Sequence, residues 1–194
     1  MVSVAGRSLR ELIDRADERA LAAAGLACLD RCLPLFADGG DALRPVWAAV
    51  ARGDGRAWAE AVAGARTALA PAAGSGTGPA SGTADAEAVR GMLAAAPESW
   101  TADALRAWAD GCSATALTLH GRYDAGAAPD GLVERCRAGD AAGAGPLLAG
   151  ELRRQQAVLE ASAHGPTGLR RARELSVEGG RVLRAVVSRR ARTA

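Results

Sequence analysis

The sequence predicts an all-α protein, a compact bundle of six to eight mostly antiparallel helices. Apolar residues recur at helical spacing along the 194-residue chain, and no stretch alternates polar and apolar residues over six positions. Val and Ile, which favour strands, are sparse, whereas Ala and Leu, which favour helices, are abundant. The chain is 49% hydrophobic but only 3% aromatic, so Ala, Leu and Val must build most of its core.

The first helix is expected over residues 8–37. Its first half is amphipathic, and residues 20–29 are apolar nearly all round, as in a helix that crosses the interior. Asp30 and Arg31 then fall on the face that was apolar before. A bend at one of two residues would explain this shift, Gly25 or Pro34.

Shorter helices are expected to follow, each ended by Gly or Pro. They cover residues 42–52, 56–70, 85–96, a span from 99 or 101 to 120, a short piece after Asp130, and a long piece that ends at 163. Gly-Asp pairs at 53–54 and 139–140 suit helix-to-helix turns, because Gly ends a helix and Asp caps the next. The halves around them resemble each other weakly, so the chain is either a pseudo-repeat of two three-helix halves or simply repeats this turn chemistry.

Charge divides the chain into two parts. Residues 1–165, the expected bundle core, hold 16 Arg and 20 acidic residues, a net charge of −4. Within them, residues 71–84 are predicted to be a mobile loop, because a Gly, Ser and Pro-rich segment buries little apolar area. Residues 166–194 hold 8 Arg and 2 Glu, a net charge of +6. Their apolar spacing predicts a basic amphipathic helix, or a hairpin that turns at 179–180.

This C-terminal segment has four interpretations. It is the last helix of the bundle, or it binds a partner protein, nucleic acid or a membrane surface. The candidate partner-binding residues are Arg170, Arg171, Arg173, Arg181, Arg184 and Arg189. The sequence lacks the aromatic residues and motifs typical of nucleic-acid binding and the large apolar anchors typical of membrane binding.

Cys28 and Cys32 lie one helical turn apart, so both thiols could face one metal ion. A structural zinc site needs four ligands, usually in paired spacings. The remaining candidates are scattered singly along the chain: Cys112, Cys136, His120 and His164. We therefore predict that the two thiols pack in the core as small apolar groups, with no metal site.

The two histidines are predicted to close helices. His120 precedes Gly121 and His164 precedes Gly165, and a cation in the last turn followed by Gly suits a helix end. The alternative is that His120 acts as a base oriented by Asp124.

A small-molecule site, if the protein has one, should lie between helices. The candidate ligand-binding residues are Trp47, Trp58, Trp108, His120, Tyr123 and Gln155. Gln155 lies at the edge of an apolar stripe, where its amide faces either solvent or a pocket.

The chain lacks the sequence motifs of several enzyme classes. There is no Lys, which excludes a Schiff-base lysine, pyridoxal chemistry and a Walker phosphate loop. The Glu-x-x-His pairs of di-iron bundles, GxSxG and HExxH are absent as well. No catalytic residue and no cofactor is predicted.

The predicted function is therefore that of a small, non-catalytic cytoplasmic protein that binds another macromolecule, as an adaptor, regulator or inhibitor. Another protein is the expected partner, and a second copy of the chain is a further candidate. The alternatives are a small-molecule binder or enzyme with a site between helices, and a nucleic-acid accessory protein that uses the arginine-rich tail. The most apolar window spans only ten residues, so neither a targeting segment nor a membrane span is expected.

Overall fold

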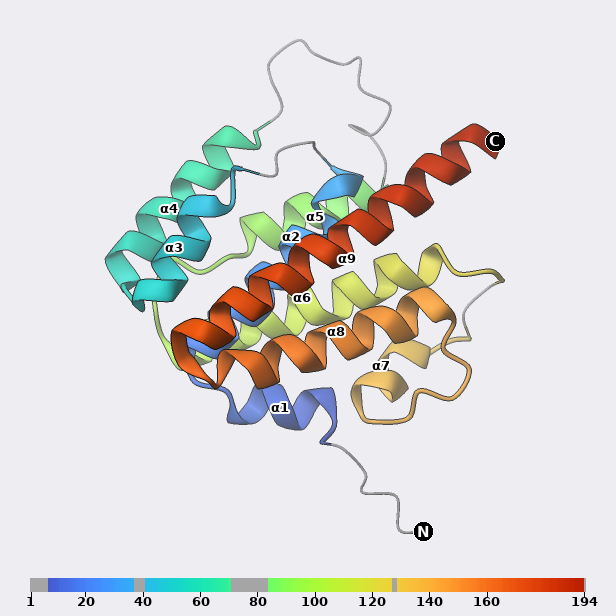
Figure 1. The fold of residues 1–194 in the computed structure, drawn as a ribbon, viewed down its shortest axis with the longest axis horizontal. Coiled ribbons are helices and arrows are strands. Elements are labelled where there is room, and N and C mark those ends of the chain that lie inside the picture. Colours follow the sequence, from blue (N-terminus) through green and yellow to red (C-terminus); the bar gives the residue numbers. More distant parts are fainter. Residues whose placement is uncertain (1–6, 37–40, 71–83, 127–128, 194) are drawn as a thin grey trace.

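The computed structural model of this chain confirms the all-α bundle (Figure 1). It describes residues 7–36, 41–70, 84–126 and 129–193, and these ranges contain nine α-helices, one 3-10 turn and no strand. The elements are α1 (Leu9–Arg15), α2 (Glu18–Cys32), η1 (Leu33–Leu35), α3 (Arg44–Arg52), α4 (Gly55–Ala68), α5 (Ala84–Ala94), α6 (Ala102–Arg122), α7 (Leu132–Arg137), α8 (Pro146–Ser162) and α9 (Gly165–Thr193). The loop predicted at 71–84 lies outside the described residues except for Ala84, which begins α5.

Helix α2 is the centre of the bundle. It contacts α3, α5, α6, α8 and α9, and every residue from 20 to 29 is buried, as the apolar run predicts. It approaches α6 closely at Gly25, where a Cβ atom would lie 2.6 Å from the ring of Trp108. The absent side chain therefore lets α6 pack directly against the backbone of α2.

The prediction of one helix over residues 8–37 is wrong. The backbone is extended at Ala16, which ends α1, and Asp17 then begins a new helix by accepting a hydrogen bond of 2.8 Å from the N–H of Ala20. An Asp at this position caps a helix better than it continues one. The later bend does fall near Pro34, which lies in η1.

The two Gly-Asp pairs differ in structure. Gly53 has a left-handed φ of 65°, and Asp54 caps α4 by accepting hydrogen bonds from two backbone N–H groups of its first turn. Gly139 also has a positive φ, of 107°, but Asp140 lies in a turn ahead of α8 and does not cap it. The predicted helix-to-helix turn is therefore present only at the first pair.

Helix α9 is continuous through Gly179 and Gly180 and packs on α2 and α8. Figure 1 shows it lying across the molecule beside α8, to which a short connection joins it. Its apolar stripe faces inward, with Leu169, Ala172 and Leu183 buried. A Gly in a helix costs about 1 kcal/mol relative to Ala. Packing explains the Gly at position 179, because a Cβ atom there would overlap the side chain of Arg31 beneath it.

The cysteines pack in the core, as predicted. Cys28, Cys32 and Cys112 are free thiols and are at most 2% exposed. Burial raises the pKa of Cys28 to about 12 and that of Cys32 and Cys112 well above its ordinary value. Thiolate nucleophiles need a low pKa, so these thiols are unreactive.

The described residues contain no cluster of metal-ligating side chains and no helix suited to cross a membrane. Within them, no three His, Cys, Asp or Glu side chains gather so that they could hold a metal ion. Among the same residues, no helix combines the length and the apolar character needed to cross a membrane.

Candidate functional site

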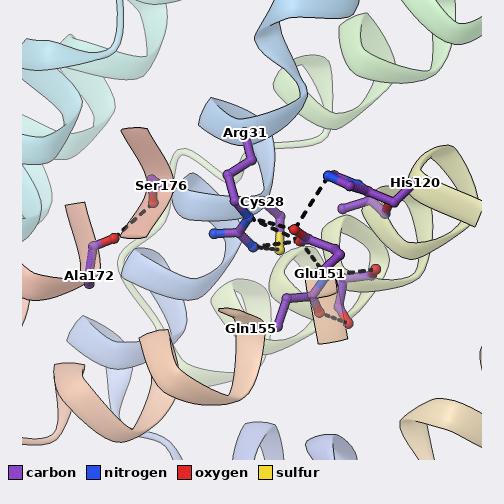
Figure 2. A network of polar contacts seen from close by, with 9 residues as sticks. Cys28, Arg31, His120, Glu151, Gln155, Ala172 and Ser176 are labelled. Atoms are coloured by element: carbon purple, nitrogen blue, oxygen red, sulfur yellow. Dashed lines mark hydrogen bonds and ion pairs between the residues drawn. The ribbon is translucent and has the colours of Figure 1, made fainter. Parts of the chain in front are cut away.

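A buried ion pair joins two helices in the middle of the bundle (Figure 2). Arg31 on α2 donates from Nε to Oε2 of Glu151 on α8 at 2.8 Å and from Nη2 to Oε1 at 2.7 Å. Both side chains are completely buried. This two-point geometry is the strongest form of an arginine-carboxylate contact. It compensates two charges that would otherwise be very costly inside a protein.

Neighbouring polar groups extend this pair into a network. The amide nitrogen of Gln155 donates to Oε1 of Glu151 at 2.9 Å, and its amide oxygen accepts from the hydroxyl of Ser113 at 2.7 Å. Nε2 of His120 lies 3.6 Å from Oε2 of Glu151. Nη2 of Arg31 also contacts Sγ of Cys28 at 3.4 Å.

The electrostatics of Glu151 follow from these contacts. Burial raises its pKa, but the charges of Arg31 and His120 and the hydrogen bonds from Arg31 and Gln155 lower it more. The resulting pKa lies below the ordinary value, so the group is a carboxylate at neutral pH. A catalytic acid needs a pKa near the working pH. This carboxylate therefore suits a structural role better than proton transfer.

The network is also closed to solvent. Five of its members, Arg31, Ser113, His120, Glu151 and Gln155, are at most 3% exposed. Helix α9 closes the network on the side of Arg31, where Gly179 lies directly against the Arg31 side chain. A substrate could reach this buried network only if the helices around it moved apart.

The second polar feature is a groove on the surface. It lies between α9, the N-terminal end of α3 and the C-terminal end of α2 with η1, and its volume is about 300 Å³. Four exposed arginines line it: Arg44 from α3, and Arg173, Arg181 and Arg184 from α9. Leu33, Pro34 and Val177 supply its apolar surface.

The groove contains one acidic residue, Asp30. Its Oδ2 accepts a hydrogen bond of 3.0 Å from Nε1 of Trp47, which also lines the groove. Burial raises the pKa of Asp30, and the hydrogen bond from Trp47 and the charges of Arg31 and Arg173 reduce that rise. The groove thus combines four positive charges with one negative charge at its base.

The groove arginines lie close together without an ion-pair partner among the described residues. Within the described part of the chain, none of the four forms an ion pair. Arginines on other faces do, among them Arg10, Arg56, Arg66, Arg122 and Arg137. Four unpaired cations in one groove make it the strongest candidate for binding an anionic group.

The structure does not bring the six candidate ligand residues into one pocket. His120 and Gln155 meet in the buried network, and Trp47 lines the groove. Trp58 and Trp108 pack edge to face in the core, with ring centroids 5.4 Å apart.

Tyr123 caps the end of α6, and its side chain makes contacts different from those of the other five candidates. Its hydroxyl donates to Asp85 at 2.9 Å, and the guanidinium of Arg190 lies 5.0 Å from its ring centroid. Burial, followed by Asp85, raises its pKa to about 12. Tyr123 thus helps fix the end of α9 to the bundle.

The histidine prediction is correct in part for each residue. Nδ1 of His164 lies 2.8 Å from the carbonyl oxygen of Glu160, and Gly165 has a left-handed φ of 67°, but His164 follows the last turn of α8. His120 does lie in the last turn of α6, with Nδ1 2.8 Å from the carbonyl oxygen of Ala116, but its ring is buried and Gly121 continues the helix.

The alternative pairing of His120 with Asp124 is not found either. The Asp124 carboxylate instead caps α8, accepting hydrogen bonds of 2.7 and 2.9 Å from the N–H groups of Leu147 and Leu148.

The six candidate partner-binding arginines fall into groups. Arg173, Arg181 and Arg184 line the groove, and Arg170 lines a shallow depression next to it. Arg171 forms an ion pair with Glu174, and Arg189 is exposed near the end of α9.

Sequence reasoning missed Glu151 as a partner for Arg31 and Arg44 as part of a basic site. A signal for the first was present. Arg31 falls on an apolar helix face, and Glu151 lies on the same stripe as Leu148 and Gln155, at helical spacing. Two charged residues on apolar faces suggest a buried pair. No comparable signal links Arg44 to α9, because the groove is formed by tertiary packing.

Comparison of this chain with protein-family models, with curated proteins and with solved structures finds no match.

Proposed function

We propose that this protein is a non-catalytic binding protein that receives an acidic segment of another protein in the groove between α9, α3 and the end of α2. The observation that carries this proposal is the set of four exposed arginines that form no ion pair among the described residues. Anionic groups on a partner would supply the missing counter-charges, and complementary charge also speeds encounter.

The apolar surface of the groove supports a protein as the partner. Val177 is 43% exposed and is the one large hydrophobic side chain that stands exposed in the described part of the chain. Beside it, the half-buried Pro34 gives a partner side chain a further apolar contact. Single-stranded nucleic acids bind through stacking on exposed aromatic rings. The aromatic residue of this groove, Trp47, is only 6% exposed.

The groove is small for a whole interface. A stable protein complex buries about 800 Å² on each partner. We therefore propose that the groove anchors one segment and that neighbouring parts of α9 complete the contact. Arg170 and Arg173 on the adjoining depression extend the basic surface, while Glu174 and Glu178 limit it.

We also propose that the protein acts in a reducing compartment such as the cytoplasm. Its four cysteines are all free thiols, and none is exposed. Free thiols persist where glutathione and thioredoxin keep them reduced.

Site-specific photo-crosslinking in the native host tests the proposal. A benzoylphenylalanine at Val177 should crosslink to a discrete protein that then binds the purified chain with a measurable Kd. The same probe at Ala107, an exposed position of α6, is the positional control. Binding of the purified partner should weaken at least tenfold in the R173E/R184E variant, because two charge-assisted contacts become repulsive.

A matched charge control is available in R52E/R153E. Both residues are exposed, lie outside the groove and change the net charge by the same amount. If R52E/R153E weakens binding as much as R173E/R184E does, the effect is one of net charge and the proposed groove is wrong. If Val177 crosslinks to a second copy of this chain, the groove serves self-association and the proposed foreign partner is wrong. Crosslinks no stronger at Val177 than at Ala107 would contradict the proposal.

A further inference from the structure

We infer that the anionic group bound in the groove is a phosphorylated side chain of the partner protein. This inference rests on the proposed function and goes further, because it names the chemistry of the ligand. Three properties of the groove carry it: its charge, its volume and the type of its cationic groups.

The charge of the groove exceeds what one carboxylate can balance. Arg44, Arg173, Arg181 and Arg184 bring four positive charges, and Asp30 removes one. Arg181 and Arg184 lie three residues apart on α9, a spacing at which like charges repel. Arg44 adds a further positive charge from the opposite side of the groove. The free groove therefore has an excess of about three charges, and a ligand that carries more than one negative charge gains most from it.

The volume of the groove restricts how that charge can be delivered. At about 300 Å³ it stands at the lower limit of small-molecule pockets. It holds one side chain with its neighbouring backbone more readily than several acidic residues or a nucleotide. A phosphorylated Ser or Thr brings about two negative charges and three acceptor oxygens in one side chain. Asp and Glu bring only one charge in a similar volume.

The cationic groups suit a phosphoryl group. A guanidinium offers a planar fork of donors that matches phosphate oxygens in two-point contacts. Asp30 is the one group in the groove that opposes an anion, since its negative charge lies beside Arg173, and its Oδ2 accepts the hydrogen bond from Trp47. We expect Arg173, Arg181 and Arg184 to contact the phosphoryl oxygens and Val177 to contact the backbone or side chain next to them.

The test compares three heptapeptide pools of random flanking sequence whose central residue is phosphoserine, Glu or Ser. Binding to the full-length protein is followed by the Nε–Hε NMR signals of ¹⁵N-labelled arginine. Signals are assigned from single Arg→Gln variants. The phosphoserine pool should bind at least about tenfold more tightly than the Glu pool and should move the four groove signals. The Ser pool should move none of them.

Two variants locate the effect. R173Q/R184Q should lose at least about tenfold in affinity for the phosphoserine pool, whereas R52Q/R153Q should lose less than about twofold. Asp30→Asn keeps an oxygen that accepts from Trp47 and removes the negative charge, so it should tighten binding roughly threefold to tenfold.

The pH profile separates a phosphoryl group from a carboxylate. The second pKa of a phosphomonoester is near 6, so lowering the pH from 7.5 to 5.5 should weaken binding of the phosphoserine pool several-fold. Protonation of Asp30, whose pKa is raised by burial, works in the opposite direction. Glu174 and Glu178 lie on the adjoining depression. The experiment is therefore repeated in Asp30→Asn, where this opposing effect is absent.

The outcomes distinguish this inference from the function on which it rests. Equal binding of the Glu and phosphoserine pools overturns the phosphoryl inference and leaves the acidic partner in place. If inorganic phosphate alone binds as tightly as the phosphoserine pool, the ligand is a free anion and the inference is wrong. If no pool binds while photo-crosslinking at Val177 yields an arginine-dependent partner, again only the phosphoryl inference fails. Failure of the crosslinking experiment itself overturns the proposed function.

Discussion

Arginine occupies two opposite environments in this protein, and the comparison separates structure from function. Arg31 is completely buried, and Glu151 receives three of its hydrogen bonds. Arg173 and Arg184 are exposed in a groove and form no ion pair within the described part of the chain. A buried charge requires a partner in the fold itself, whereas an exposed cluster can leave its partner to be supplied by binding.

Helix α9 links the two regions, because one face covers Arg31 and another lines the groove. The groove arginines are therefore held in place by the helix that closes the interior. Substitutions on the exposed face of α9 should therefore change ligand binding without changing bundle stability. Substitutions beneath α9 should change both.

Removal of α9 should have the largest effect. Deleting residues 166–194 exposes the surface that Leu169 and Leu183 cover, and burial of two such side chains contributes about 3 to 6 kcal/mol. The deletion also exposes the Arg31 side chain. The free energy of unfolding, measured with urea, should therefore fall by at least this amount. A truncated chain that unfolds at the same urea concentration as the full chain would show that α9 is an appendage.

Breaking the buried pair should come next. Glu151→Gln leaves Arg31 charged and buried, which should lower the free energy of unfolding by about 3 to 5 kcal/mol. The paired variant R31M/E151L removes both charges and should recover most of that loss. If the paired variant were as unstable as the single one, packing and not charge would explain the cost.

The buried pair also predicts an acid effect with a definite sign. The pKa of Glu151 is lower in the folded protein than its ordinary value of 4.5. The stability it contributes is therefore present above that value and is lost as the pH falls through the lower, folded-state pKa. The R31M/E151L variant lacks Glu151, so its free energy of unfolding should not show this loss as the pH falls below 4.5. Urea unfolding of both proteins at several acidic pH values measures the difference.

The sequence predicts those features of the two regions that depend on local helical periodicity. It does not predict the features that depend on how the helices pack. The buried run of α2, the inward stripe of α9 and the burial of Cys28 and Cys32 follow from helical periodicity, and the structure confirms them. The ion pair and the groove depend on residues more than 100 positions apart. Their contacts are fixed by how helices pack, which periodicity does not describe.

The break at Ala16 was missed for a different reason. Apolar spacing continues across it, so periodicity predicts one helix. The side chain of Asp17 decides the boundary instead, because Asp favours the capping position that precedes the first turn of a helix.

The glycines of α9 provide a smaller test of the link between the two regions. Gly179→Ala places a methyl group against the anchored side chain of Arg31 and should destabilise the protein by about 1 to 3 kcal/mol. Gly180→Ala is the matched control, because its Cβ would have ordinary contacts of 3.7 Å or more with the α2 backbone. It should be neutral or stabilise the protein by up to about 1 kcal/mol through helix propensity. Equal effects at both positions would contradict the close approach over Arg31.

The smallest effect is expected where the two regions meet, at Asp30. Its pKa is raised above the ordinary value of 3.8, chiefly by burial, so the folded protein binds this proton more tightly than the unfolded chain. Stability from this group is fully present below the ordinary value and is lost as the pH rises through the raised pKa. Asp30→Asn, which keeps an acceptor for Trp47, should therefore be slightly more stable than the wild type at pH 7.

Urea unfolding at several pH values measures this difference. The advantage of Asp30→Asn should shrink toward zero as the pH approaches 3, where Asp30 itself is neutral. The acid loss caused by Glu151 is common to both proteins and cancels in the comparison. An Asp30→Asn variant that is less stable at pH 7 would mean that the ionised carboxylate holds the groove arginines and Trp47 more strongly than burial opposes it. In that case Asp30 would be the internal counter-charge of the groove, and tighter anion binding by the variant would no longer be expected.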